Sequence, residues 1–551
     1  MTDCKKIAEL IFTDVDKSTE YYEELYPARE LPEGARVTRF APSPTGYLHF
    51  GGLYAGFASK LTALSTNGVF MLRIEDTDKK REVEDGVTGI VTGLNAFGVS
   101  ADEGVTGFNT EYGNYGPYTQ SHRRAIYRAF AKKLMEEGKA YPCFCTPEDL
   151  DEIRAKQENE DIKGYYGSYA KCRDLSDEEI IEKINAGVPY TVRLRSIGDI
   201  SRKIKFDDMI KGKIEMSENV NDVVILKADG IPTYHFAHAV DDHLMHTTHV
   251  VRGDEWIASV PLHIELFRAC GFKPVKYAHI APIMKEENGG KRKLSKRKDP
   301  EANVSYYIEK GYPEASVKEY MLTILNSNFE EWRRANKNED IAKFPFNLKK
   351  MSVSGALFDM VKFNDVSKNV ISVMTAKQVY KLVTDWAMDY NEVLYALFVE
   401  NPEKAKAILN IDRENPKPRK DIACWEEVEN YVSFFYNELY DADSTLPEHI
   451  NKEDAIEILT KYKEVYSAND SKEDWFNKIK ELCSACGFTP NVKEYKQNPD
   501  AFKGHVGDVS TVIRVAITSR TNTPDLYYIM QILGSDEVMR RIDDTINSYK
   551  A

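Results

Sequence analysis

The spacing of apolar residues divides the chain into a first part, where strand and helix patterns alternate, and a second part with helical spacing alone. Val37, Thr38 and Phe40 are typical of a short strand, and apolar residues then recur at helical spacing from residue 53 to residue 64. Residues 69–74 form an apolar run typical of a buried strand. Such alternation predicts a parallel sheet with helices over residues 36 to about 140.

Both ends of the chain are predicted to be helical. Residues 1–35 are predicted to form a helical extension that ends at Pro27, Pro32 and Gly34. Beyond about residue 375 the spacing stays helical, and Asn451 and Ser471, each with a carboxylate three residues on, indicate helix starts. The predicted apolar faces comprise Ala455, Ile458, Leu459 and Tyr462 in one helix and Trp475, Ile479 and Leu482 in the next.

The pattern between these parts changes twice. Over residues 141–222 a charged helix is followed by short strand patterns at 192–195 and 204–206. We expect the apolar run 223–226 to reopen the core sheet, whose second half we place at 223–290. A basic run at 291–298 opens a further segment that we extend to residue 374.

Composition restricts the class of protein. A chain of 551 residues is too long to fold around one hydrophobic core, which predicts several domains. Its content of 42% hydrophobic and 29% charged residues is typical of a soluble globular protein. No apolar run approaches the ~20 residues that span a bilayer. Eight cysteines in so long a chain predict no disulfide framework and favour a cytoplasmic location. A net charge of −14 argues against DNA and indiscriminate nucleic-acid binding, but leaves room for a local RNA-binding surface.

Three stretches carry candidate chemistry. His49 lies where a loop containing Pro42 and Pro44 feeds a helix, and a helix N-terminus with unpaired N–H groups suits a phosphate. Residues 75–78, Glu-Asp-Thr-Asp, follow a buried strand, where open α/β sheets bind ligands. The basic run at 291–298 taken alone is equally compatible with a solvated turn or a nuclear-type signal.

Together these stretches resemble the class I aminoacyl-tRNA synthetases in their glutamyl form. The run Arg-Phe-Ala-Pro-Ser-Pro-Thr-Gly at 39–46, followed by His-Phe-Gly-Gly at 49–52, is similar to the first signature motif, with Gly52 where the class often has His. Lys-Leu-Ser-Lys-Arg at 293–297 is similar to the second motif. Residues 354–359 resemble a stem-contact segment, and residues 513–534 the closing segment of bacterial glutamyl enzymes.

The resemblance implies a domain organisation. It predicts a Rossmann-like α/β catalytic core at 36–140 and 223–290, interrupted at 141–222 by an α+β domain that binds the tRNA acceptor end. The second-motif loop and stem-contact domain would occupy 291–374, and an all-α anticodon-binding region 375–551. The resemblance assigns no role to residues 1–35.

The implied reaction is attachment of L-glutamate to tRNA(Glu) in two steps, through glutamyl-adenylate and transfer to the 3′-terminal adenosine. ATP and Mg²⁺ would be required, and relatives generally activate glutamate only with tRNA bound. By motif position, the catalytic residues would be His49, Lys293 and Lys296. The ATP-binding residues would be Ser43, His49, Gly51, Gly52, Glu255, Met284, Lys293, Leu294, Ser295, Lys296 and Arg297. Glutamate would be bound by Arg39, Ala41, Ser43, Glu75, Tyr234, His238 and Arg252, although His238 stands where some relatives have Asn.

A metal site is a further expectation. Cys143, Cys145 and Cys172 resemble a zinc knuckle that some family members carry, with the fourth ligand left open among Asp174, Tyr166 and Tyr169. The five histidines between 235 and 249 fit no standard zinc spacing. Cys483 and Cys486 have no partner ligands nearby in sequence, which favours packing.

Several alternatives remain. A glutaminyl enzyme usually has Pro-Pro-Glu-Pro-Asn-Gly where this chain has Ala-Pro-Ser-Pro-Thr-Gly at 41–46. The truncated paralogue that modifies tRNA lacks the helical C-terminal half, and an inactive RNA-binding protein would not need His49, Lys293 and Lys296. An enzyme that also charges tRNA(Gln) cannot be distinguished from sequence. A monomer is the family expectation.

Overall fold

The computed structural model describes residues 3–78, 83–337, 339–443 and 445–551. The chain forms two compact units. Unit 1 comprises residues 1–308 and 318–359, and unit 2 comprises residues 309–317 and 360–551. Each unit is described separately below.

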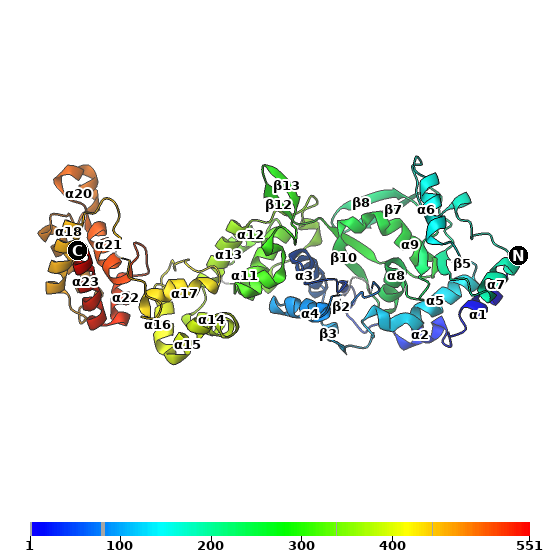
Figure 1. The fold of residues 1–551 in the computed structure, drawn as a ribbon, viewed down its shortest axis with the longest axis horizontal. Coiled ribbons are helices and arrows are strands. Elements are labelled where there is room, and N and C mark those ends of the chain that lie inside the picture. The colour runs from blue at the N-terminus through cyan, green and yellow to red at the C-terminus, as the bar shows by residue number, and fades with distance from the viewer. Residues whose placement is uncertain (1–2, 79–82, 338, 444) are drawn as a thin grey trace. The chain divides into compact units, whose positions relative to one another are not determined.

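The first half of the core in unit 1 is a four-stranded sheet in the order β1 (Val37–Phe40), β2 (Val69–Leu72), β3 (Glu103–Gly107) and β4 (Thr110–Tyr112). The first three strands are parallel, as the alternating pattern predicted, and β4 returns antiparallel to β3. The helices that connect and follow these strands are α3 (Phe50–Leu64), α4 (Gly86–Ala96) and α5 (Arg124–Glu136) (Figure 1).

The second half of the core adds the parallel pair β10 (His249–Gly253) and β11 (Lys276–Ile280), with α8 (Tyr234–Leu244) and α9 (Val260–Ala269). The backbone N–H of Thr248 donates to the carbonyl of Val37 over 2.9 Å, which joins the start of β10 to the start of β1. The carboxyl ends of β1 and β10 therefore lie side by side. Open parallel sheets bind ligands at such a point.

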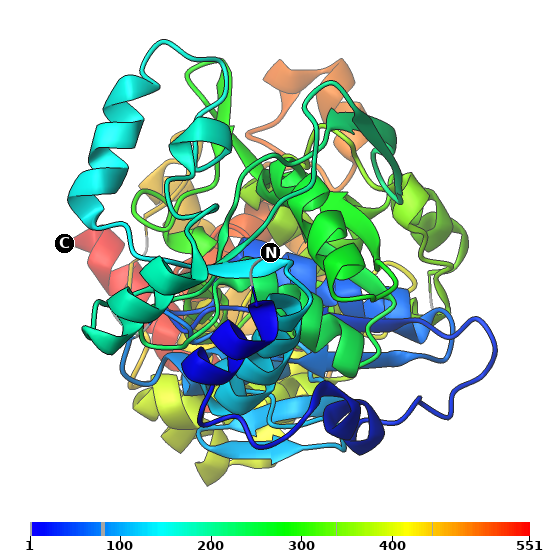
Figure 2. The same ribbon diagram turned by 90° about the vertical axis from the view of Figure 1, so that its right-hand side faces the viewer.

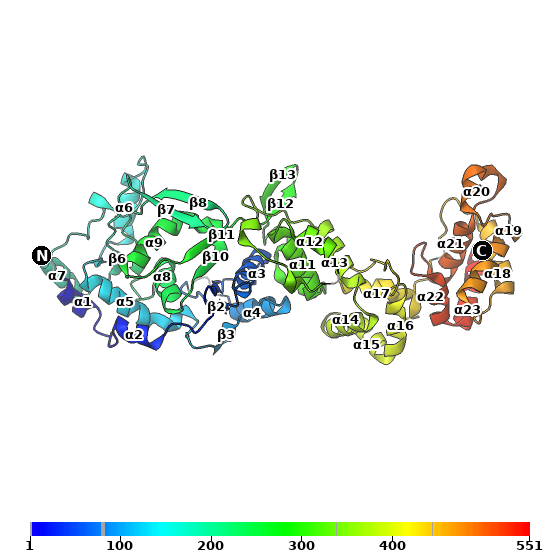
Figure 3. The ribbon, with the colours of Figure 1, turned by 180° about the vertical axis from the view of Figure 1, so that it is seen from behind.

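The strand at 224–226 corrects the sequence prediction. Residues 223–226 do not reopen the core sheet, because β9 (Val224–Leu226) pairs antiparallel with β6 (Thr191–Leu194), which pairs with β5 (Ala140–Cys143). An apolar run in the sequence predicts a buried strand, but it does not predict which other strand pairs with it. The insert also contains α6 (Pro147–Lys156), α7 (Asp177–Asn185) and a hairpin of β7 (Lys203–Asp208) and β8 (Gly212–Ser217), so both short strands predicted there are confirmed. Figure 3 shows this hairpin beside β11, which β7 contacts.

The N-terminal extension folds as two short helices, α1 (Cys4–Ile11) and α2 (Thr19–Leu25), which confirms its helical character. Asp3 and Ser18 cap them by accepting backbone N–H groups. Both helices, blue in Figure 2, pack on α5, and α1 also contacts α7 of the insert. The extension therefore contacts both the core and the insert.

The basic run begins on the second strand of an antiparallel hairpin, β12 (Met284–Glu287) and β13 (Gly290–Lys293), and continues into the loop after it. The backbone of Met284 exchanges hydrogen bonds with residues 356–358: its N–H donates to Ala356 (2.8 Å), and its carbonyl accepts from Phe358 (2.7 Å). The segment after the core thus fixes the base of the hairpin. The helices that follow β13 are α10 (Val304–Glu309), α11 (Glu314–Leu325) and α12 (Phe329–Ala335).

Unit 2 is helical, as predicted. Asn451 and Ser471 cap α18 (Lys452–Val465) and α19 (Lys472–Ala485), and the predicted apolar faces of both helices are buried in one core. Cys483 and Cys486 lie in this core, in agreement with a packing role. No helix in the described part of the chain is long and apolar enough to cross a membrane. The other helices are α13 (Met360–Ser372), α14 (Ala376–Tyr390), α15 (Glu392–Glu400), α16 (Pro402–Asn410), α17 (Glu426–Val432), α20 (Val492–Gln497), α21 (Val506–Thr518), α22 (Leu526–Leu533) and α23 (Ser535–Lys550).

Candidate active site

A cavity of about 1170 Å³ opens in unit 1 at the carboxyl ends of β1, β2 and β10. It brings together segments that are more than two hundred residues apart in sequence. The predicted site residues that line it are Arg39, Ala41, Ser43, His49, Gly51, Gly52, Glu75, Tyr234, Arg252, Glu255, Lys293 and Leu294. The acidic run 75–78 also lines it. The other predicted residues, Met284, Ser295, Lys296, Arg297 and His238, are not part of this lining.

His49 is the N-cap of α3. Its Nδ1 accepts the backbone N–H of Gly51 over 2.8 Å, so in the neutral ring the proton lies on Nε2. Burial, together with the positive charges of Lys296 and Lys293, lowers the pKa of His49 to about 4. The ring is therefore neutral at physiological pH and offers one N–H donor at a helix N-terminus, which suits an anionic oxygen.

The two motif lysines approach His49 from the hairpin. Lys293 ends β13 and lines the cavity, and the ammonium of Lys296 donates to the carbonyl of Tyr47, two residues before the imidazole. The electrostatic effect of both lysines on His49 agrees with this placement. Lys293 and the neutral N–H donor of His49 thus face one cavity, and the positive charge of Lys296 lies near His49, an arrangement that suits a polyphosphate.

Asp299 holds the loop that carries these lysines, and sequence reasoning missed it. Its carboxylate, only 2% exposed, accepts two hydrogen bonds from Arg292 (2.6 and 2.8 Å) and one from the backbone N–H of Ser295 (2.9 Å). The bonds from Arg292, together with that from Ser295, hold the pKa of Asp299 well below its usual value, although burial opposes this change. The signal in the sequence is one carboxylate directly after a basic run, Lys298-Asp299-Pro300.

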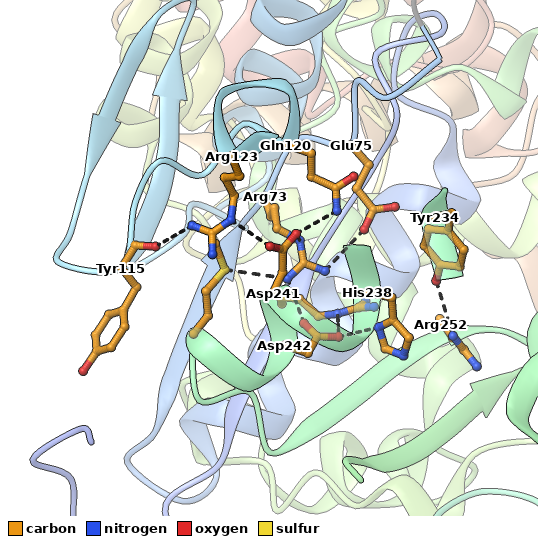
Figure 4. Close-up of polar contacts among 12 residues, drawn as sticks. Arg73, Glu75, Tyr115, Gln120, Arg123, Tyr234, His238, Asp241, Asp242 and Arg252 are labelled. Carbon is orange, nitrogen blue, oxygen red and sulfur yellow. Dashed lines mark hydrogen bonds and ion pairs between the residues drawn. The ribbon is translucent and has the colours of Figure 1, made fainter. Parts of the chain in front are cut away.

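A second set of missed residues forms a buried charge network beneath the cavity (Figure 4). Asp242 binds Arg73 (2.8 Å) and lies 3.4 Å from Arg39. Its neighbour Asp241 binds Arg123 at 2.7 Å and also accepts hydrogen bonds from Gln120 and Tyr127. Buried charges persist when paired and hydrogen-bonded, and this network fixes the position of Arg39. Two adjacent aspartates in the helix after residue 233, together with an arginine in the apolar strand 69–74, were the available signal.

Glu75 extends from the end of β2 into the cavity and lies 3.3 Å from Arg73. Burial raises its pKa to about 7, although the charges of Arg73 and Arg39 oppose this change. Because ionisation of this buried carboxyl group is costly, a cationic ligand that pairs with the carboxylate would stabilise its ionised form. An ammonium group is such a ligand.

His238 does not line the cavity. It is fully buried behind Tyr234, with its ring stacked on the Tyr234 ring at a centroid distance of 5.9 Å (Figure 4). Its Nε2 is hydrogen-bonded to the Tyr277 hydroxyl (2.9 Å), and its Nδ1 lies 2.5 Å from Asp242. Burial lowers its pKa to about 3, so the ring is neutral. This position supports the pocket from behind.

The three cysteines of the insert converge. Their Sγ atoms lie within 4.8 Å of one another, and the side chain of Tyr165 lies beside them. The Tyr165 hydroxyl lies 3.2 Å from Cys145 Sγ and 3.5 Å from Cys143 Sγ. The three proposed fourth ligands have other partners: Tyr166 and Tyr169 bind Glu160, and the exposed Asp174 pairs with Arg195. The set of thiols was predictable, whereas the fourth group was not.

Comparison with known proteins agrees with this geometry. The family described as tRNA synthetases class I (E and Q), catalytic domain, matches residues 36–365, and an anticodon binding domain matches residues 493–546. The chain is 50% identical over 543 residues to glutamate–tRNA ligase of Clostridium perfringens (strain 13 / Type A), covering 98% of this chain and 100% of that protein. It is 48% identical over 542 residues to the enzyme of Acetivibrio thermocellus, covering 98% and 99%. A crystal structure of a glutamate tRNA ligase from Elizabethkingia meningosepticum, in complex with its amino acid, aligns with a TM-score of 0.74 at 28% identity, covering 93% and 99%.

Proposed function

The chain belongs to the class I tRNA synthetases of the E and Q type and attaches glutamate to tRNA(Glu), and from this premise we propose that both chemical steps occur in the cavity of unit 1. One observation carries the proposal. Neutral His49 and Lys293 share this cavity with Glu75 and Arg252, and Lys296 lies beside it on the carbonyl of Tyr47, so groups suited to a triphosphate adjoin groups suited to an amino acid.

In the first step an α-carboxylate oxygen of glutamate attacks the α-phosphorus of ATP, and the bond to the pyrophosphate oxygen breaks. The attacking group is already an anion, so the protein has to supply position and positive charge rather than a nucleophile. His49 Nε2–H would donate to a phosphate oxygen, and Lys293 and Lys296 would neutralise the departing pyrophosphate. Mg²⁺ would bind together with ATP, held by phosphate oxygens, and we propose no protein ligand for it. Gly51 and Gly52, at the start of α3, leave room for the nucleotide to approach the backbone.

Glutamate presents one cation and two anions. Glu75 would bind the ammonium, and Arg39, Arg252 and Tyr234 would bind the carboxylates, with Ser43 beside them. Glutamine would place a neutral amide against a buried guanidinium, and an uncompensated buried charge costs about 3–5 kcal/mol. This cost would exclude glutamine without an editing step.

The second step transfers the glutamyl group to a hydroxyl of the 3′-terminal adenosine of tRNA. We propose that the insert at 141–222 receives the acceptor end and that the helices beyond residue 375 read the anticodon. Whether tRNA(Gln) is charged as well depends on those helices. All eight cysteines are free thiols in the structure, which supports the proposed cytoplasmic location, and we propose a monomer.

The test of the proposed function is aminoacylation of purified tRNA(Glu) and tRNA(Gln) with labelled glutamate and, separately, labelled glutamine. We expect glutamyl-tRNA(Glu) and no glutaminyl-tRNA. Product on tRNA(Gln) would identify the broader enzyme. No glutamyl product on either tRNA would overturn the proposal.

We also propose a structural zinc ion in the insert. The fit rests on four donors: the thiols of Cys143, Cys145 and Cys172 and the hydroxyl of Tyr165. Structural zinc is tetrahedral and takes thiolates as ligands; the three thiols would supply three of the four positions and the Tyr165 oxygen the fourth, and the ion would tie β5 to the loop before α7. We expect about one zinc per chain by mass spectrometry of metal content. Cys172→Ser should lose it, whereas Cys270→Ser, outside the cluster, should retain it; a metal-free wild type would refute the site.

A further inference from the structure

The environment of Arg252 differs from that of the other buried arginines of the core. Its side chain, 6% exposed, is surrounded by neutral acceptors: His279 Nε2 (3.1 Å), His263 Nδ1 (3.1 Å), the Tyr234 hydroxyl (3.3 Å) and the Trp256 carbonyl (3.4 Å). Among the residues that the structure describes, no carboxylate lies within ion-pair distance of it. Arg39, Arg73 and Arg123, by contrast, all have aspartate partners.

A guanidinium held only by neutral acceptors retains its full charge for a ligand. This arrangement also makes the guanidinium dependent on those acceptors for its position. Its Nε–H points at His279, and its Nη2 points at His263 and Trp256. Nη1 carries two N–H groups and donates to Tyr234 alone, whereas Nε has one N–H for His279 and Nη2 has two for His263 and Trp256; Nη1 is therefore the part with donor capacity left for a substrate carboxylate (Figure 4).

His279 can accept from Arg252 only in one tautomer. An arginine N–H cannot accept, so Nε2 of His279 must carry the lone pair and Nδ1 the proton. Nδ1 lies 2.6 Å from Oδ2 of Asp208, a carboxylate 3% exposed. Burial alone would raise the pKa of Asp208, but hydrogen bonds from His279 and from backbone N–H groups hold that pKa below its ordinary value, so Asp208 acts as an acceptor. The carboxylate thereby selects the tautomer that Arg252 requires.

Asp208 comes from a different part of the chain. It ends strand β7 of the insert, and its carboxylate also accepts the backbone N–H groups of Ile210 (2.9 Å) and Lys211 (2.8 Å), which fixes its own orientation. The next residue, Met209, donates its N–H to the carbonyl of Tyr277 on β11 (2.9 Å). The end of the hairpin is therefore bonded to the strand that carries His279.

We propose that Asp208 and His279 are positioning residues for glutamate recognition: Asp208 fixes the His279 tautomer, and His279 fixes Arg252 so that its Nη1 end faces the substrate carboxylate. This inference rests on the proposed function, in which Arg252 binds glutamate. Neither residue touches the substrate. The insert thus supplies part of the amino-acid pocket in addition to any contact it makes with tRNA.

The test uses the full-length enzyme with tRNA(Glu) in ATP–pyrophosphate exchange. Asp208→Asn keeps the oxygen that binds Ile210 and Lys211 but presents an amide N–H to His279, which forces the proton to Nε2, facing Arg252. His279→Ala removes the acceptor, and His279→Gln offers a carbonyl oxygen in its place. His249→Gln, at the start of β10 and away from Arg252, controls for any change of a buried histidine.

We expect Asp208→Asn and His279→Ala to raise the KM for glutamate roughly 10- to 100-fold, the range seen when a partner that orients a binding group is lost. The KM for ATP and kcat should change little, His279→Gln should recover most of the loss, and His249→Gln should resemble wild type. An unchanged glutamate KM in both variants, or an equal loss in kcat and in both KM values, would overturn the inference.

A second measurement observes the tautomer directly in the wild-type protein. In wild-type protein with ¹⁵N-labelled histidine, long-range ¹H–¹⁵N correlation should show His279 protonated at Nδ1 alone, with the resonance assigned by its loss in His279→Gln. A ring protonated at Nε2 would refute the inference. If wild type itself shows no glutamate-dependent exchange with tRNA present, the proposed function fails, whereas an active wild type with unaffected variants refutes the positioning role alone.

Discussion

At the scale of single residues, burial favours the uncharged form of both His49 and Glu75. The ring and the carboxyl group face the same cavity, and transfer from water to a less polar surrounding penalises whichever form carries charge. The pKa of His49 falls to about 4, whereas that of Glu75 rises to about 7. His49 is thereby a constant N–H donor, and Glu75 is a group whose charge depends on pH and on its ligand.

Replacement of His49 by alanine should lower the rate of ATP–pyrophosphate exchange by roughly 10²–10³, the cost of removing one donor aimed at developing charge. His49→Asn is the matched control, because asparagine can cap α3 and still donate one N–H. It should lie closer to wild type than the alanine variant. A loss below about tenfold in His49→Ala would remove the imidazole from the mechanism.

The elevated pKa of Glu75 predicts a pH dependence. Above about pH 7 the carboxylate is charged and can bind the glutamate ammonium; below it the protonated form cannot, so kcat/KM for glutamate should fall about tenfold per pH unit. At saturating glutamate, kcat/KM for ATP should be flat over the same range, because the bound ammonium keeps Glu75 ionised. Glu75→Gln should be weakly active and lack the inflection. A flat wild-type profile for glutamate between about pH 6 and 8 would contradict this role.

At the scale of elements, Lys293 ends strand β13 and Lys296 lies in the loop that follows, and hydrogen bonds within this segment stabilise the loop. Lysine side chains are long and flexible, so their position depends on the backbone that carries them. Asp299 binds Arg292 and the backbone N–H of Ser295 and so closes the loop on itself. The motif in the sequence identified the cations, but the group that orders them required the structure.

Asp299→Asn should therefore slow pyrophosphate exchange by about 10- to 100-fold, because small displacements of groups that stabilise the transition state are costly. The effect should appear in kcat, with the KM for glutamate unchanged. Glu287→Gln is the control: Glu287 pairs with the same Arg292 but is exposed, and exposed pairs contribute about 0–1 kcal/mol. Equal effects of the two substitutions would show that the loop needs no buried clamp.

At the scale of the whole molecule, residues outside the catalytic motifs hold the segments of unit 1 together. Arg29, in the N-terminal extension, pairs with Glu103 on β3, donates to the carbonyl of Met245 after α8 (3.0 Å) and stacks on Tyr115 at 3.8 Å. One side chain thus joins the extension to both halves of the core. The resemblance assigned no role to residues 1–35, and these contacts indicate a structural one.

Arg29→Ala should lower the free energy of unfolding of unit 1 by about 1–3 kcal/mol, since it leaves the partly buried carboxylate of Glu103 without this partner. Chemical denaturation followed by tryptophan fluorescence and circular dichroism measures this change. The double variant Arg29→Ala/Glu103→Ala should recover part of the loss, because no buried charge is then left unpaired. If the Arg29→Ala variant were as stable as wild type, these contacts of the extension would not stabilise unit 1.

The sequence by itself determined what local pattern and short motifs can encode. The parallel strands of the first half of the core and the helical second half, with its caps at Asn451 and Ser471, follow from periodicity and turn residues. The ligands of residues 39–52 and 293–297 were predicted from the resemblance of these short motifs to the two signature motifs of the family. These features depend only on residues that are neighbours along the chain, so local physical chemistry is enough to specify them.

The tertiary structure alone decided which distant groups meet. It assigned β9 to the antiparallel sheet of the insert, chose Tyr165 over its neighbours beside the three thiols, moved His238 behind the pocket and brought Asp208, His279 and Arg252 into line. The physical reason is common to all four. The spacing of apolar residues along the chain predicts which residues are buried. It does not predict the partner of a strand edge, a hydroxyl or a buried charge, because long-range packing determines that partner.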